Sequence, residues 1–350
     1  MSQPVPEEED EKLPPVLIAS IHDIRYFSAL LRGVSFVNRA TATVTQSGLV
    51  VTVEEARTLL ATAYVFSDIF DEYTYTPPPV SASQPGPSQA DSESDPEDPA
   101  TALEIPLTTL IECLNIFGTA GSTAASTASK TKKWHRAEDE SDPGDGGGSG
   151  GAASGKGRID SFFSAGALHR AEDTSGPTAT CEITTYAAEP HLDLPFDTEN
   201  TVLKVILKSS WLRDALSEVD PSCDKLTFLG NPPPPVGQAG NAQPRAVPQT
   251  SKPMLRIQIL GAFGSTEMDY PNDREVLETF ECAEPVKFSY RFGHISRTLR
   301  ALQNSTKTSL RIDREGLLAL QFLMPSPKPR GGTSDAFIEF RSLPLDESAV

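Results

Sequence analysis

The side chains of this sequence that are best suited to chemistry are cations that fall on predicted helices. Arg297 and Arg300 are three positions apart in a helix predicted near 293–303, so they share one helix face. Because arginine and lysine bind phosphate oxygens, a row of such helices suits the backbone of a nucleic acid. The plainer interpretation is an ordinary solvated helix face. The candidate cations are Arg25, Arg32, Lys208, Arg213, Arg297 and Arg300.

Carboxylates offer a second chemistry, because converging carboxylates can hold the divalent metal ions of a nuclease. The sequence has three such groups: Asp68 with Asp71 and Glu72, Asp197 with Glu199, and Asp313 with Glu315. Each group falls at a predicted strand end, connector or turn, where aspartate is favoured because it hydrogen-bonds the backbone. We therefore interpret them as structural, and expect no catalytic residue, no metal site and no cofactor.

Histidine and cysteine residues suggest no further site. The five histidines lack metal-ligand spacing, and the sequence contains neither a Walker loop nor a Gly-x-Ser-x-Gly motif. The cysteines form no Cys-x-x-Cys pair, which predicts reduced thiols in a nuclear or cytosolic protein. They are Cys113, Cys181, Cys223 and Cys282. We expect neither a signal peptide nor a membrane-spanning run.

The elements that must position the cations repeat one plan in the two halves of the chain. An apolar strand at Leu17–Ile21 leads into an amphipathic helix at about 23–34, and a strand at Val202–Leu207 leads into a helix at about 209–219. Each half also has an alternating hairpin with a glycine turn, at 42–53 and 310–320. Alternation with a period of two predicts antiparallel strands with one buried face. The repetition predicts two equivalent domains side by side.

Much of the negative charge lies outside these elements. The formal net charge is −18, but three polar segments near 7–11, 91–98 and 138–145 each contribute five acidic residues. These segments are too polar and too rich in Pro and Gly to pack. The ordered core is therefore much less acidic than the whole chain, and the net charge does not describe any single face. A nucleic-acid partner is not excluded.

Composition divides the chain into four parts, two of which contain inserts. Residues 1–15 are predicted to be a disordered acidic tail, and residues 187–200 a connector between the halves. The first domain is predicted at 16–186, with disordered inserts at 77–100 and 119–177. The second domain is predicted at 201–345, with a disordered insert at 231–253.

Six stretches carry a resemblance to a known family. They are LIASIHDIR at 17–25, GLVVTVEEA at 48–56, LIECLNIFG at 110–118, WLRDALSEVD at 211–220, FGSTEMDYP at 263–271 and REGLLALQ at 314–321. Together they are similar to the Rad-one (Rec-one) subunit of the heterotrimeric DNA-damage checkpoint clamp. The match covers most of the predicted ordered segments, in the right order.

The resemblance implies an α+β, PCNA-like DNA clamp fold of two domains, with antiparallel sheets outside and helices inside. It implies that this chain and two sister subunits close a ring around double-stranded DNA, loaded by an ATP-driven clamp loader. The six candidate cations would then face the channel and contact phosphates without reading bases. Checkpoint signalling, DNA repair and location in the nucleus follow as expectations. A 3′→5′ exonuclease attribution in the family keeps a metal-dependent nuclease as the alternative, and a scaffold without DNA contact is a third interpretation.

One departure from the family concerns the first domain. The family has further strand-forming sequence between the insert that follows Gly118 and the strand at Thr180. Here residues 164–177 supply mainly Ala, Gly and polar residues, with one Leu-His pair. The sequence therefore predicts that one or two strands of the first domain are missing, through a real loss or a lost exon.

A second departure is a short motif inside the insert at 119–177. Lys156-Gly157-Arg158-Ile159-Asp160-Ser161-Phe162-Phe163 resembles the peptide with which clients bind clamps, with Lys in place of the usual Gln. Ile159, Phe162 and Phe163 would form the apolar plug of a single helical turn. The proposed targets are a pocket of its own ring or the replicative clamp. The alternative is a chance apolar cluster in an unstructured insert.

Overall fold

The structure is a computed structural model that describes residues 14–21, 23–78, 99–118, 157–159, 167–171, 179–233, 253–262, 264–271, 273–328 and 332–346. In this part of the chain antiparallel sheets predominate and helices are few, which confirms the antiparallel α+β character predicted from the sequence. Across the same residues, no helix is both long enough and apolar enough to cross a lipid bilayer.

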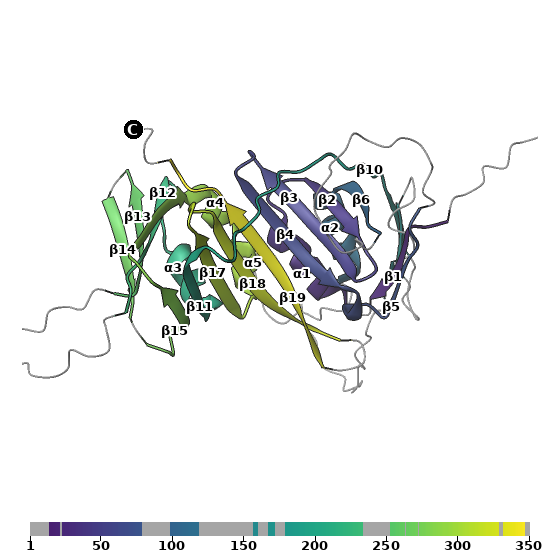
Figure 1. Ribbon diagram of the computed structural model, residues 1–350. Coiled ribbons are helices and arrows are strands. Elements are labelled where there is room, and N and C mark those ends of the chain that lie inside the picture. Colours follow the sequence, from purple (N-terminus) through teal and green to yellow (C-terminus); the bar gives the residue numbers. More distant parts are fainter. Residues whose placement is uncertain are drawn as a thin grey trace, which may run out of the picture.

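A single ten-stranded sheet runs through both halves of the chain (Figure 1). From one edge to the other its strands are β10 (Tyr186–Ala187), β6 (Thr101–Pro106), β2 (Arg39–Val44), β3 (Gly48–Glu55), β4 (Leu59–Phe66), β19 (Thr333–Ser342), β18 (Leu318–Pro327), β17 (Lys307–Asp313), β11 (Thr201–Lys208) and β15 (Leu277–Cys282). Every pair of neighbours in it is antiparallel.

Two smaller sheets lie at the two ends of the molecule (Figure 1). The five-stranded sheet has the order β5 (Glu72–Tyr75), β1 (Leu17–Ile21), β7 (Gly157–Ile159), β8 (Ala167–Ala171) and β9 (Ala179–Ile183). The four-stranded sheet has the order β14 (Gly264–Tyr270), β13 (Leu255–Gly261), β12 (Lys225–Gly230) and β16 (Val286–Arg291).

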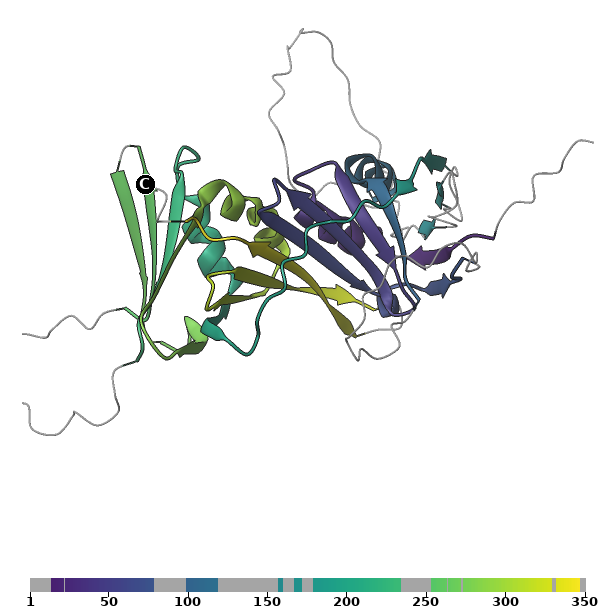
Figure 2. The ribbon, with the colours of Figure 1, turned by 45° about the horizontal axis from the view of Figure 1, so that its top comes forward.

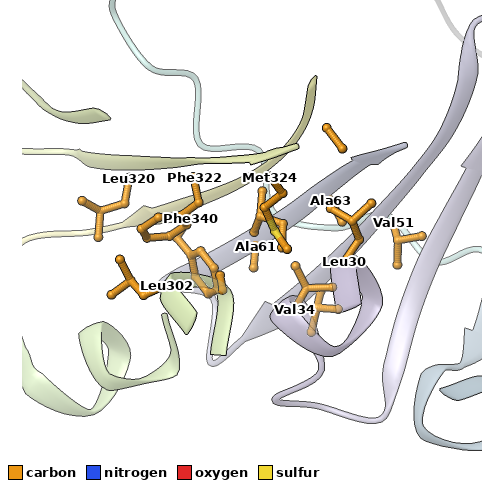
Figure 3. Packing of buried hydrophobic residues seen from close by; sticks show 14 of the residues in the cluster. Leu30, Val34, Val51, Ala61, Ala63, Leu302, Leu320, Phe322, Met324 and Phe340 are labelled. Carbon is orange, nitrogen blue, oxygen red and sulfur yellow. The ribbon is translucent and has the colours of Figure 1, made fainter. Parts of the chain in front are cut away.

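The halves are joined where β19 pairs with β4. The register sets Phe340 opposite Ala61 and Ile338 opposite Ala63, and all four side chains are at most 1% exposed. The small alanines of β4 leave room for these larger side chains and for Leu30 and Val34, which approach from a helix over the sheet (Figure 3). One hydrophobic core therefore continues across the junction.

The described helices are α1 (Ile24–Val34), α2 (Leu107–Gly118), α3 (Ser209–Ser217), α4 (Phe292–Arg297) and α5 (Leu299–Asn304), with a short 3-10 helix η1 at Ser67–Ile69. Four of them, α1, α2, α3 and α5, pack in a row against one face of the ten-stranded sheet, whereas α4 packs against β12 and β16 of the four-stranded sheet. Helix α1 contacts β3, β4 and β19, α5 contacts β18, and α3 contacts β11. Neighbours in the row touch in the order α2, α1, α5, α3.

Residues 188–200, between β10 and β11, cross the opposite face of this sheet (Figure 2). Leu194 is buried there against Leu60 and Leu317. Its carbonyl accepts a hydrogen bond of 2.8 Å from Nη1 of Arg341. The backbone N–H of Leu192 donates to Oε2 of Glu54 at 2.7 Å. These contacts hold residues 188–200 against the sheet. The sequence had predicted this segment only as a connector between the halves.

The local predictions of hairpins are confirmed, whereas one predicted helix is divided. Strands β2 and β3, and strands β17 and β18, form the two hairpins. The helix predicted near 293–303 is interrupted at Thr298, which separates α4 from α5. The hydroxyl of Thr298 donates to the carbonyl of Ile295 at 2.6 Å, and its N–H donates to the same carbonyl at 3.0 Å. These three-residue bonds tighten the turn and redirect the chain.

The prediction that residues 119–177 form an insert without strands is wrong at two places. Strand β7 pairs with β1, with Ile159 opposite Ala19, and β8 pairs with both β7 and β9. The strand region expected to be missing is therefore present in the five-stranded sheet. Composition gave no sign of it because these short strands, each with a single large apolar residue, pair through their backbones without an alternating apolar pattern.

Gly48, at the start of β3, is expected to tolerate no side chain. Its φ is 155°, and a Cβ there would lie 2.2 Å from the carbonyl oxygen of Val65 in the paired strand. We expect Gly48→Ala to lower the free energy of unfolding by about 2–3 kcal/mol, because backbone rather than a movable side chain must give way. Denaturant titration followed by circular dichroism measures this.

Gly293, an exposed residue of α4, provides the matched control for Gly48. A Cβ at Gly293 meets nothing within 4 Å. Gly293→Ala is therefore expected to leave stability unchanged or to raise it by up to about 1 kcal/mol, because alanine favours the helix. Equal stability of the Gly48→Ala and Gly293→Ala proteins would contradict the geometry described for the β2–β3 turn.

Candidate nucleic-acid interface

Helix α1 places its apolar residues against the sheet and two candidate cations on its exposed side. Its sequence begins after Asp23, whose side chain accepts a hydrogen bond from the N–H of Arg25 and so caps the helix. The apolar residues at helical spacing turn toward the sheet: Ile24, Phe27, Leu30, Leu31 and Val34 are buried. Arg25 and Arg32 are seven positions apart, about two turns, and both are exposed on the opposite side.

Arg25 is largely neutralised by its own helix cap. Its Nε and Nη2 donate to the two carboxylate oxygens of Asp23 at 2.8 and 2.6 Å. These hydrogen bonds, with the attraction between the opposite charges, raise the pKa of the Arg25 guanidinium. Because the pair is exposed, it adds little to stability. Its relevance is that Arg25 presents little net charge to an anionic partner.

Two further candidate cations are neutralised in the same way. Arg213 of α3 forms an ion pair of 2.9 Å with its neighbour Asp214. Arg297 of α4 donates from Nη2 and Nε to the two carboxylate oxygens of Glu55, at 3.0 and 3.2 Å. Glu55 ends β3, so this pair joins the two halves of the chain. It fixes the position of α4 more than it offers charge to a ligand.

Arg32 and Arg300, which lie near the C-terminal end of α1, have neutral hydrogen-bond acceptors. Nη1 of Arg300 donates to the carbonyl and the hydroxyl oxygen of Ser35, at 3.0 and 3.2 Å. The hydroxyl of Ser35 in turn donates to the carbonyl of Arg32 at 3.0 Å. Nη2 of Arg32 donates to the side-chain amide oxygen of Asn115 in α2. None of these acceptors is ionised, and the negative end of the helix dipole favours both cations.

Lys208 is the third candidate cation that is not paired with a carboxylate among the described residues. It is exposed at the residue before α3, and it has no ion-pair partner among the described residues. The six predicted site residues therefore divide into two kinds. Arg25, Arg213 and Arg297 are paired with carboxylates, whereas Arg32, Arg300 and Lys208 have no ion-pair partner among the described residues.

The carboxylate groups considered for a metal have other partners. Asp313 accepts from the N–H groups of Glu315 and Leu317 at 3.0 and 2.9 Å, and so shapes the β17–β18 turn. Asp197 accepts hydrogen bonds from the side chain and the backbone N–H of Asn200, and these bonds lower the pKa of Asp197. In the described part of the chain, no three His, Cys, Asp or Glu side chains gather as metal ligands would.

Asp68, in η1, is held in a network with the β18–β19 connection. It accepts from the hydroxyl of Ser334 at 2.8 Å and forms an ion pair of 2.7 Å with Lys328. Burial opposes its ionisation, but the hydrogen bonds from Lys328 and Ser334 outweigh that effect and lower its pKa. The position of Asp68 at a strand end agrees with the structural interpretation given from the sequence.

The motif at 156–163 is only partly within the described residues. Strand β7 gives residues 157–159 an extended backbone, so the helical turn predicted for the motif is wrong at Ile159. Phe162 and Phe163 lie outside the described residues. Binding of this motif to a clamp stays a prediction.

The sequence analysis did not identify the partners of the candidate cations, which determine whether each cation is paired with a carboxylate. Asp23 is two positions from Arg25, and Asp214 is adjacent to Arg213, so their pairing had a local signal in the sequence. Glu55 is 242 positions from Arg297, and Ser35 is 265 positions from Arg300, so only the packing of the halves brings them together.

Comparison with known proteins finds one matching family model and several similar sequences. The family model described as "Repair protein Rad1/Rec1/Rad17" matches residues 16–136 and 170–324. The "Cell cycle checkpoint protein RAD1" of Mus musculus is 26% identical over 341 residues, covering 97% of this chain and 96% of its own length. The "DNA damage checkpoint control protein rad1" of Schizosaccharomyces pombe is 26% identical over 92% of this chain and 84% of its own length. The "DNA repair exonuclease REC1" of Mycosarcoma maydis is 25% identical over 95% of this chain and 96% of its own length.

Proposed function

The chain belongs to the Rad1/Rec1/Rad17 family of repair proteins, and we propose that it is a non-enzymatic subunit of a heterotrimeric ring that encircles DNA at damage sites. In this role it supports DNA-damage checkpoint signalling and repair. The names of its relatives in mouse and fission yeast, which are checkpoint proteins, support the proposed role.

The observation that carries the proposal is the arrangement of helices and sheets. The helices cover one face of a sheet that runs through both halves, and the connector covers the other face (Figure 2). A PCNA-like arrangement of two domains uses this layering, with helices toward the DNA and sheets outside. The end sheets stop at the strands β5, β9, β14 and β16, whose outer edges have no partner within the described chain. Such edges are suited to pairing with neighbouring subunits.

The proposed mechanism needs no base recognition. Arg32, Arg300 and Lys208 offer positive charge to phosphates of the double helix, and such contacts are independent of sequence and weakened by salt. Each contact is weak, so the ring can slide, whereas release requires the ring to open. Retention is therefore topological. The proposed partners are two sister checkpoint-clamp subunits, an ATP-driven clamp loader and double-stranded DNA, and the proposed location is the nucleus.

The test is co-expression with candidate sister subunits, followed by mass measurement and a retention assay on plasmid DNA. We expect a complex with one copy of each subunit. After loading onto nicked circular DNA, it should resist a salt wash and should be released when the plasmid is linearised. A chain that remains alone in the mass measurement, or equal retention on circular and linear DNA, would contradict the proposal.

A metal-dependent 3′→5′ DNA exonuclease is the second candidate function, favoured by the name of the Mycosarcoma maydis relative. It is tested with purified protein, Mg²⁺ and end-labelled DNA. We expect no nucleotide release above that of a buffer control. Release that is lost in both Asp68→Asn and Asp71→Asn proteins, with unchanged thermal stability, would favour the nuclease.

A further inference from the structure

Two thiols that are far apart in the sequence touch in the folded chain. Sγ of Cys113, in α2, lies 3.3 Å from Sγ of Cys181, in β9. The contact joins a helix of the row to one of the two edge strands of the five-stranded sheet. The other two cysteines make no such pair: Cys282 donates to the carbonyl of Glu284 at 3.0 Å, and Cys223 lies in a different part of the chain.

We propose that Cys113 and Cys181 form a reversible disulfide when the protein meets a small-molecule disulfide such as oxidised glutathione. This inference does not depend on the proposed function. It changes the expectation, drawn from the spacing of the cysteines, that all four remain ordinary reduced thiols.

Geometry and exposure support the pair as a site of oxidation. The two sulfurs need to approach by only about 1.3 Å to reach the bond length of about 2.05 Å. Cys181 is half-buried, so a dissolved oxidant can reach it more easily than Cys113, which is buried. Burial, together with the neighbouring Cys181 thiol, raises the pKa of Cys113 to about 11, which keeps it protonated until it reacts.

The reaction consists of two thiol–disulfide exchanges. The thiolate of Cys181 attacks one sulfur of oxidised glutathione, which forms a mixed disulfide and releases one glutathione. Cys113 then loses its proton and attacks the Cys181 sulfur of that mixed disulfide, which releases the second glutathione. Two protein thiols are oxidised, one glutathione disulfide is reduced to two thiols, and the two protons pass to the departing glutathiones.

The bond would fix the edge strand β9 to α2. In the described chain β9 has a partner on one side only, β8. The remaining contact of β9 with the body of the protein includes α2. A covalent tether between residues 68 positions apart restricts the unfolded chain and should hold this edge in place on heating.

The experiment treats the full-length chain with oxidised glutathione in air-free buffer and counts thiols after denaturation. We expect the number of free thiols to fall from four to two, and the mass to fall by about 2 Da, with reversal by dithiothreitol. A non-reducing peptide map should join the peptides that contain Cys113 and Cys181. The oxidised protein should melt several degrees higher than the reduced protein.

Matched variants separate this pair from general thiol oxidation. Cys181→Ser should yield no internal disulfide and no rise in melting temperature, whereas Cys223→Ser should still yield both. Four free thiols after treatment, stable glutathione adducts without ring closure, or a bond that joins any other two cysteines would overturn the proposal. Because both variants alter half-buried side chains, their melting temperatures in the reduced state show whether each is folded.

Discussion

Reversing the charges of Arg32 and Arg300 together is expected to weaken DNA binding by the assembled complex by about 10- to 100-fold at moderate salt. These two arginines meet at the C-terminal end of α1 and have only neutral acceptors, so their charge is available to phosphates. The slope of log affinity against log salt should fall by about two, because two phosphate contacts are lost. Fluorescence anisotropy with duplex DNA at several salt concentrations measures both quantities.

The matched control changes the same net charge at exposed arginines in strand-connecting turns. Arg274 precedes β15 and Arg314 lies between β17 and β18, and neither has an ion-pair partner within the described structure. Arg274→Glu with Arg314→Glu should leave the affinity within about twofold, since screening weakens distant charges. Equal losses in the two double variants would show that total charge, and not the helix row, determines binding. Equal binding by the Arg32→Glu, Arg300→Glu complex and the wild type would refute this assignment outright.

Replacing Phe340 with alanine is expected to destabilise the protein by about 3–5 kcal/mol. Phe340 is 1% exposed, and its ring lies 5.8 Å from that of Phe322 and 6.0 Å from that of Phe36. It stands opposite Ala61 at the junction of the halves, and the side chain of Ala61 is too small to fill the space that the ring would leave (Figure 3). Denaturant unfolding should show the loss with both fluorescence and circular dichroism.

Leu260 provides the comparison for Phe340, because it is a large apolar residue in a strand but is 51% exposed. Leu260→Ala should change stability by no more than about 0.5 kcal/mol. A cost below about 1.5 kcal/mol for Phe340→Ala would mean that the core relaxes around the junction, and that the two halves are less tightly coupled than the packing indicates.

The sequence predicted those parts of the fold whose signal is local. The hairpins at β2–β3 and β17–β18 follow from alternation and a glycine turn, and α1 follows from its apolar spacing behind Asp23. Strands β7 and β8 had no such pattern, because backbone pairing with β1 and β9 forms them. The break at Thr298 depends on side-chain and backbone bonds to one carbonyl, which helical periodicity does not reveal.

The sequence indicated which cations the site would use, but not which of them form ion pairs. The helices and their exposed arginines were identified from spacing, and five of the six cations are exposed, with Arg213 intermediate. Which of them are paired with a carboxylate depends on contacts such as that of Glu55 with Arg297, which joins residues of opposite halves. The thiol contact was missed for the same reason, since the whole predicted insert at 119–177 separates α2 from β9 in the sequence.

The pairing of β4 with β19 also sets an order of events during synthesis. Strand β4 is complete at Phe66, but its partner on that side, Thr333–Ser342, is the last described strand. A nascent chain must therefore carry an open strand edge at β4 while more than two hundred further residues leave the ribosome. A product that ends before residue 333 keeps that edge open permanently, which makes it a template for aggregation.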